Sequence, residues 1–144
     1  MKAMVEEALY RKAAWRQSSS PGAGKLAAAV AHCEAIVGGS PNHLHAVSER
    51  LDHPVKRQLF LVCYAAMRVL DDAVDNRFLA RPAAERTRAR AAMGDLLARW
   101  LDQACAAAVG TFAPDAAAFE PEVFFALNHY AGASDIGQDP WRKL

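Results

Sequence analysis

The chain has 144 residues, enough for one domain with a hydrophobic core, and its 53% hydrophobic and 23% charged residues exclude a disordered chain. Lysine and arginine number 17 and aspartate and glutamate 16, so a formal charge of +1 argues against nucleic acid as the main partner. Alanine, the best helix former, occurs 32 times, so we predict an all-α fold.

The N-terminal segment is predicted to be an arm. Residues 2–16 have the pattern of a short amphipathic helix, and the Ser-Pro-Gly run that ends at Gly22 is a linker. We therefore assign residues 1–22 to the arm and its linker and residues 23–144 to the main helical domain. Because no signal-sequence core and no stretch of 18 apolar residues occurs, we expect a cytoplasmic protein.

Glycine and proline delimit the next helices. A helix over residues 25–37 is predicted to stop at Gly38-Gly39, and a short helix should follow over residues 43–51. The triplet Asp52-His53-Pro54 is a helix start, with Asp52 or His53 as the N-cap and Pro54 in the first turn. From there the helical pattern continues to about Leu79.

Five polar side chains share one face of this long helix. At about 100° per residue, four of them fall within an arc of about 60°, and the fifth lies at its edge. They are Tyr64, Arg68, Asp71 and Asp75, with Asp72 at the edge. The remaining positions are mostly apolar, so the helix is expected to be buried nearly all round, with the polar stripe lining one cavity or a partner.

Buried carboxylates on one stripe need a positive charge. Arg68 offsets only one of them, whereas Mg²⁺, a hard cation that prefers oxygen ligands, resolves the repulsion when Asp71, Asp72 and Asp75 hold it. Such an ion would bind a diphosphate and stabilise its departure, with Arg68 on the same phosphate and the Tyr64 hydroxyl at the reacting carbon skeleton. The alternative for the Asp-Asp-x-x-Asp string is a solvated helix face.

The rest of the chain predicts more helices. They are expected over residues 83–109 and 119–131, with loops over 110–114 and 132–140 and a helix opening at 141–144. A basic run is by default a solvated face, and it is compatible with peripheral membrane contact or with steering of diphosphates: Arg77, Arg81, Arg86, Arg88 and Arg90. The three cysteines lack paired spacing, which favours free thiols.

One segment of the long helix resembles the squalene/phytoene synthase family: Tyr64-Ala-Ala-Met-Arg68-Val-Leu-Asp71-Asp72-Ala-Val-Asp75. The family pattern is a Tyr, an Arg four residues later and an Asp-rich motif with Asp at its ends. The segment Cys33-Glu-Ala-Ile-Val-Gly-Gly-Ser40 is similar to the helix and the Gly-Ser turn that precede this motif in the family. The resemblance implies an all-helical bundle of the isoprenoid synthase type.

The family condenses two allylic prenyl diphosphates, farnesyl or geranylgeranyl, through a cyclopropyl diphosphate. The resemblance implies that Asp71 and Asp75 hold Mg²⁺ and that Arg68 contacts phosphate. It places Tyr64 at the position of the Tyr that assists proton removal, and Ser40 at a phosphate contact. NADPH is implied only where a squalene-type reduction follows, and nothing in this sequence supports it.

Two departures from the family pattern stand out. The Ser-x-Ser-Phe contact is here Ser40-Pro41-Asn42-His43-Leu44, so one hydroxyl remains. A second Asp-rich motif on a helix is missing, because Asp135 and Asp139 have the spacing but lie in a predicted loop. We therefore expect residues 23–144 to be the N-terminal half of such a domain, with exposed apolar faces that favour self-association. The alternatives are a catalytically silent relative that acts as a binding or assembly protein, and a plain helical domain.

Overall fold

The structure of the chain is a computed structural model that describes residues 22–39 and 43–144. Every regular element in these ranges is a helix, which confirms the all-α prediction. The elements are α2 (Ala23–Gly38), α3 (His43–Glu49), α4 (Pro54–Asp71), η1 (Asp72–Phe78), α5 (Ala83–Ala108), α6 (Pro121–Gly132) and α7 (Asp139–Arg142). The predicted helix over residues 2–16 and the residue Ser40 lie outside the described residues.

The bounds of most helices agree with the sequence prediction to within two residues. The start of α4 shows how local residues determine where a helix begins. His53 has the extended backbone of an N-cap, and its Nδ1 accepts a hydrogen bond from the N–H of Lys56 at 3.5 Å. Pro54 follows in the first helical position, where its fixed φ is suited to the helix. No described helix combines the length and the apolar character needed to cross a bilayer.

The long helix does not continue as a regular α-helix beyond Asp71, which corrects the prediction. Residues Asp72–Phe78 form the π-helix η1, and the N–H of Leu79 donates to the carbonyl of Val74, five residues earlier, at 2.8 Å. A π turn therefore holds more residues than the 3.6 of an α turn, and each residue advances by less than 100°. Asp75 is therefore rotated about the helix axis by less than the prediction assumed, and it leaves the position predicted for it on the polar stripe.

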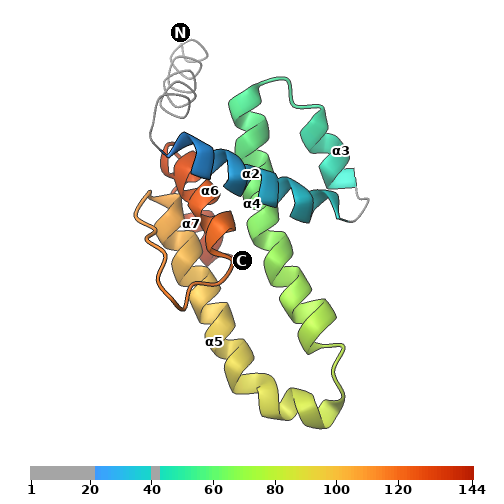
Figure 1. The fold of residues 1–144 in the computed structure, drawn as a ribbon. Coiled ribbons are helices and arrows are strands. Elements are labelled where there is room, and N and C mark those ends of the chain that lie inside the picture. The colour runs from blue at the N-terminus through green and yellow to red at the C-terminus, as the bar shows by residue number, and fades with distance from the viewer. Residues whose placement is uncertain (1–21, 40–42) are drawn as a thin grey trace.

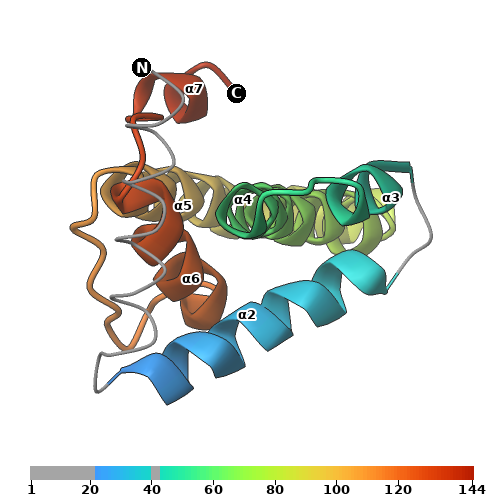
Figure 2. The ribbon, with the colours of Figure 1, turned by 90° about the horizontal axis from the view of Figure 1, so that it is seen from above.

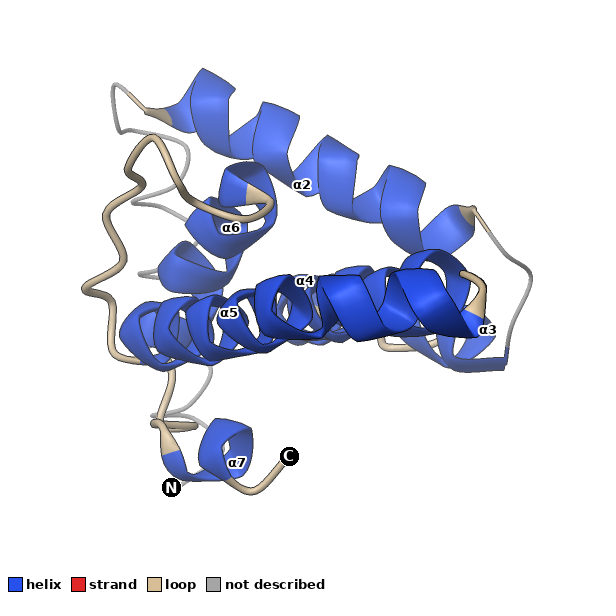
Figure 3. Ribbon diagram, turned by 90° about the horizontal axis from the view of Figure 1, so that it is seen from below, coloured by secondary structure: helices blue, strands red, loops and turns tan. Residues whose placement is uncertain are grey.

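α6 is the centre of the core. It packs against α2, α4 and α5, and Figures 2 and 3 show it between α2 and the layer of α4 and α5. Five of its side chains have no exposed surface: Val123, Phe124, Ala126, Leu127 and Ala131. The alanines let the neighbouring helices approach closely, while the large side chains fill the space between them.

α4 and α5 run antiparallel in one layer, with α2 on one side of this layer and α7 on the other (Figure 2). A pair of tryptophans joins three of these helices. The indole N–H of Trp100 on α5 donates to the carbonyl of Ala66 on α4 at 2.8 Å. Trp141 on α7 packs against Trp100 with 5.8 Å between ring centroids, so it fixes α7 to the layer.

Two amide side chains hold the connection between α5 and α6. Gln103, only 7% exposed, donates from Nε2 to the carbonyl of Phe119 at 2.7 Å and accepts from the N–H of Phe119 at 2.8 Å. Asn128 accepts through Oδ1 from the N–H of Phe112 at 2.9 Å. These backbone groups of the connection are therefore paired although they are partly withdrawn from water.

The joined ends of η1 and α5 extend away from the core. No residue from Val74 to Arg99 is buried, and the first buried side chain of α5 is Trp100. Figure 1 shows this hairpin at the end of the molecule opposite α2, α6 and α7. We call residues 74–99 the hairpin arm. Because none of its side chains is fully buried, packing contributes less to its stability than to that of the core.

Candidate functional site

Part of the predicted site lies in a polar pocket between α2 and α4, which we call the α2-side pocket. Nη2 of Arg68 lies 3.3 Å from Oδ1 of Asp72, and Nδ2 of Asn76 donates to the same oxygen at 2.8 Å. The pocket has a volume of about 470 Å³, and Arg77 and Glu120 also line it. It therefore contains two arginines, one of which already pairs with a carboxylate.

The other part lies in a groove bordered by α4, α5 and α7, which we call the α7-side groove. Tyr64 and Asp71 line it from α4, and its volume is about 540 Å³. Most of its walls are aromatic or aliphatic, and they include Met67, Leu70, Leu97, Trp100 and Trp141. Asp71 and Arg142 are its charged residues.

The expectation that the stripe lines one cavity is therefore wrong. Arg68 and Asp72 line the α2-side pocket, whereas Tyr64 and Asp71 line the α7-side groove. Figure 2 shows that α2 and α7 lie on opposite sides of the α4–α5 layer. Asp75 is exposed and lines neither pocket.

The physical reason is that α4 is buried along one side only, not nearly all round. Its buried positions, such as Val62, Ala65 and Val69, face the core, while Met67 is 36% exposed and Asp71 is exposed. The polar stripe consequently follows an outer edge of α4, with one pocket on each side of that edge. The π-helical register then separates Asp75 from the α-helical part of the stripe.

The carboxylates differ in how available they are to a cation. Asp71 and Asp75 are exposed, whereas Asp72 is bound to both Arg68 and Asn76. Across residues 22–39 and 43–144, no three His, Cys, Asp or Glu side chains gather in a way that could hold a metal ion. Mg²⁺ typically takes one or two carboxylates and completes its shell with water and phosphate oxygens. Asp71 and Asp75 are each accessible to such an ion, but Asp71 lines the α7-side groove and Asp75 lines neither pocket.

Ser40, the expected phosphate contact, lies outside the described residues. Its predecessor in the chain, Gly39, lines the α2-side pocket together with Arg68. The point where the family resemblance implies a phosphate contact therefore directly follows, in the sequence, a residue of the polar pocket wall.

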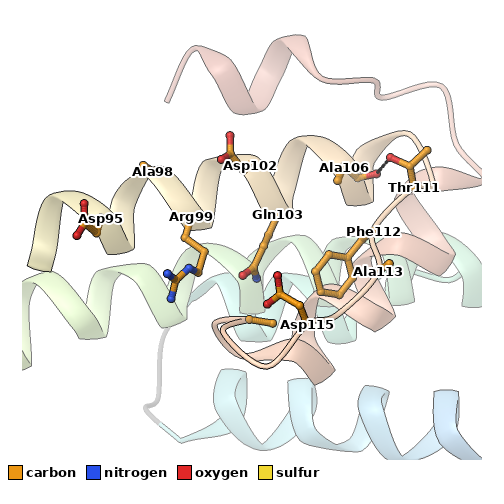
Figure 4. A pocket seen from close by; sticks show the side chains of 11 residues that line it. Asp95, Ala98, Arg99, Asp102, Gln103, Ala106, Thr111, Phe112, Ala113 and Asp115 are labelled. Atoms are coloured by element: carbon orange, nitrogen blue, oxygen red, sulfur yellow. Dashed lines mark hydrogen bonds between the residues drawn. The ribbon is translucent and has the colours of Figure 1, made fainter.

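A further pocket gathers acidic side chains between α5 and the connection to α6 (Figure 4). It has a volume of about 590 Å³, and Asp95, Arg99, Asp102 and Asp115 line it. Figure 4 shows Asp102 pointing away from Asp115, on the opposite side of α5 from Gln103. The side-chain Oδ1 of Asp115 accepts a hydrogen bond from the N–H of Ala117 at 2.9 Å. These carboxylates do not converge on a common point.

Asn76 and Trp141 line the two pockets but are not among the site residues that the sequence predicts. Asn76 follows Asp72 by four residues, so helical spacing could have added it to the stripe. Trp141 reaches the groove because the chain crosses after α6 to the other side of the α4–α5 layer (Figure 2), which no local pattern indicates. Gln138 stabilises this crossing, because its Nε2 donates to the carbonyl of Cys105 at 3.2 Å.

Two cysteines are protected from ionising. Burial raises the pKa of the Cys33 and Cys63 thiols to about 12, and nearby glutamates add to the rise for Cys33. The usual value, 9.0, applies to the unfolded chain, which therefore loses its thiol protons first. We expect the free energy of unfolding to hold up to about pH 9 and to fall as the pH rises toward 12. Urea unfolding at pH 8 and pH 10 measures this, and the loss should be smaller in Cys33→Ala/Cys63→Ala.

Comparison of the chain with protein-family models, with curated proteins and with solved structures finds no match. The resemblance of residues 33–40 and 64–75 to the squalene/phytoene synthase family, and the isoprenoid synthase type of the bundle, therefore stay predictions from the sequence. Function has to be inferred from the residues themselves and from the two pockets that flank α4.

Proposed function

We propose that the chain has the chemistry of a squalene/phytoene synthase-like prenyl transferase, which condenses two allylic prenyl diphosphates with Mg²⁺-assisted loss of diphosphate. The observation that carries this proposal is that α4 presents Arg68 to a polar pocket and Tyr64 to an apolar groove within about one turn. A prenyl diphosphate is divided in the same way, into an anionic head and a long apolar chain.

The α2-side pocket is suited to the diphosphate. Arg68 and Arg77 line it, and guanidinium groups bind phosphate oxygens through paired, charge-assisted hydrogen bonds. The side chain of Arg68 is 29% exposed, and that of Asp72 is 34% exposed. Because their ion pair is accessible to solvent, it can exchange the carboxylate for a phosphate at low cost.

The α7-side groove is suited to the prenyl chain. Its walls are mainly aromatic and aliphatic side chains, which is the lining that apolar ligands require. The ring of Tyr64 stacks on that of Phe60 with 6.4 Å between centroids, which restrains the direction of its hydroxyl. In the proposed reaction this hydroxyl assists proton removal from the reacting carbon skeleton.

Asp71 and Asp75, which are exposed along the outer edge between the pocket and the groove, would hold the Mg²⁺ ion there. Asp72 would join them once Arg68 turns to a diphosphate that reaches this edge. Mg²⁺, when bound, neutralises charge on the diphosphate and so improves it as a leaving group. The residues of the chain itself then bind the head through Arg68 and position the apolar chain against Tyr64.

One observation favours a second candidate, a catalytically silent relative that acts as a helical binding or assembly protein. Asp72 is held by Arg68 at 3.3 Å and by Asn76 at 2.8 Å, so it serves as a structural link between two turns. A silent relative would keep both pockets for binding and would not release diphosphate.

Calorimetric titration with a non-hydrolysable farnesyl diphosphate analogue tests the proposal on the full chain. We expect binding that depends on Mg²⁺ and that weakens about 10- to 100-fold in Asp71→Asn/Asp75→Asn, because a lost charged contact costs roughly 1.5–3 kcal/mol. Unchanged binding by this variant would rule out Asp71 and Asp75 as ligands.

The matched control is Asp135→Asn/Asp139→Asn. It removes the same charge at the same spacing from two exposed aspartates outside α4, and we expect it to leave the affinity unchanged. Equal weakening by both pairs would mean that only net charge matters. Release of diphosphate from farnesyl diphosphate then supports the transferase, whereas Mg²⁺-dependent binding without release supports the silent relative.

A further inference from the structure

The positive charge of the chain is concentrated at the tip of the hairpin arm. Five arginines and one acidic residue, Glu85, give residues 76–90 a formal charge of +4, so the rest of the chain carries −3. We call residues 76–90 the apex. Its arginines are Arg77, Arg81, Arg86, Arg88 and Arg90, and all but Arg86 are exposed.

The part of the fold that the structure describes does not neutralise the apex arginines. None of the five forms an ion pair with a residue in the described part of the chain. Two of these arginines are joined by a hydrogen bond, in which Nε of Arg81 donates to the backbone carbonyl of Arg77 at 3.1 Å. Arg86, Arg88 and Arg90 lie in the first two turns of α5, where no acidic residue other than Glu85 precedes them. The apex therefore presents unbalanced positive charge to solvent.

An apolar tip lies between these arginines. Leu79 is 48% exposed, and the residues that follow it around the turn, from Ala80 to Ala84, are exposed and uncharged apart from Arg81. Figure 1 shows the turn at the far end of the molecule, where no other described helix covers it. A surface that pairs basic side chains with a protruding apolar residue is characteristic of segments that bind at the interface of an anionic membrane.

We propose that the apex is a docking surface for an anionic lipid bilayer. The four arginines from Arg81 to Arg90 bind the phosphate and carboxylate groups of the lipids, and Leu79 enters the region between the headgroups and the acyl chains. The exposed leucine favours a bilayer over a nucleic acid, because a duplex backbone offers no apolar layer to receive it. This interaction goes beyond the proposed catalytic function and does not depend on it.

Sedimentation with vesicles tests the proposal on the full chain. We expect the chain to bind phosphatidylcholine vesicles that contain about one third phosphatidylserine and not pure phosphatidylcholine vesicles. Arg81→Gln/Arg88→Gln should lower the partition coefficient about 30-fold, since each basic residue near such a surface contributes about 1 kcal/mol. Arg77 is left intact in this variant because it also lines the α2-side pocket.

Arg50→Gln/Arg99→Gln is the matched control. It removes the same charge from two exposed arginines outside the apex, and Arg99 lies about 24 Å along α5 from its first residue. We expect the control to bind anionic vesicles nearly as well as the unchanged chain. Equal loss in both variants would overturn the proposal, because binding would then follow net charge.

A separate variant tests the contribution of the apolar side chain of Leu79. Leu79→Ser keeps every charge and should weaken binding to anionic vesicles several-fold, because the interface no longer receives the side chain. Unchanged binding by Leu79→Ser, equal binding to uncharged vesicles, or stronger binding to duplex DNA than to anionic vesicles would each overturn the proposal. Circular dichroism of each variant verifies that these exposed substitutions leave the helices intact.

Discussion

Replacing Phe124 with alanine is expected to lower the free energy of unfolding by about 3–5 kcal/mol, the range for a fully buried aromatic side chain. Phe124 has no exposed surface and lies on α6, which packs against α2, α4 and α5. Its ring also contacts Phe112, with 5.9 Å between centroids, so the substitution opens a cavity between α6 and the connection that precedes it. Chemical unfolding followed by circular dichroism measures the loss.

Phe125→Ala is the control for this prediction. Phe125 is the next residue on the same helix, but it is only half-buried, and the Nζ of Lys25 lies 4.9 Å from its ring centroid. We expect this variant to lose less than half as much stability as Phe124→Ala. Similar losses in the two variants would contradict the assignment of α6 as the central element of the core.

Replacing Gly132 with alanine is expected to destabilise the fold by about 1–3 kcal/mol, as overpacking at a tight contact does. A Cβ at Gly132 would lie 2.6 Å from the Cα of Gly110 and 2.9 Å from its nitrogen. Both are backbone atoms, so no side chain can move to relieve the clash. Gly110 itself has φ +76°, a left-handed conformation that strains other residues, so the two chain segments cannot easily shift.

Gly94→Ala provides a control with the opposite sign. Gly94 lies inside α5, and nothing stands within 4 Å of a Cβ built there. Alanine should therefore stabilise this helix by about 0.5–1 kcal/mol through its higher helix propensity. Thermal unfolding of both variants measures the difference, and destabilisation by Gly94→Ala would show that the hairpin arm is packed more tightly than its exposed surface indicates.

The positions of the helices could be predicted from the sequence because local chemistry sets them. Pro54 in the first helical turn and the Gly38-Gly39 pair act within one turn of the chain, so their effect is visible without tertiary structure. Gly132 shows the limit of such signals. Its position near the end of α6 looks like an ordinary helix stop, whereas the close approach of Gly110, 22 residues away, is what excludes a side chain.

The structure corrects the arrangement that the sequence predicts for the candidate site residues. Helical periodicity correctly placed Arg68 and Asp72 next to each other, because four residues make about one α turn. It assumed a constant rotation per residue, which fails after Asp71, where the chain forms η1. It also could not place Trp141 in the groove that Tyr64 lines, since the position of Trp141 depends on the path of the chain after α6.

The π-helix has a consequence for how the sequence tolerates insertions and deletions. Each π hydrogen bond spans one residue more than an α hydrogen bond, so η1 stores extra chain length inside an otherwise continuous helix. Deleting one residue between Asp72 and Phe78 would let the helix close its bonds in the α pattern, and the residues beyond would keep nearly the same direction, because the seven residues of η1 turn the chain about as far as six residues of an α-helix. The extra residue in η1 is thus compatible with the present direction of the hairpin arginines, and we expect a one-residue deletion in this short stretch to leave both that direction and the core built on α6 unchanged.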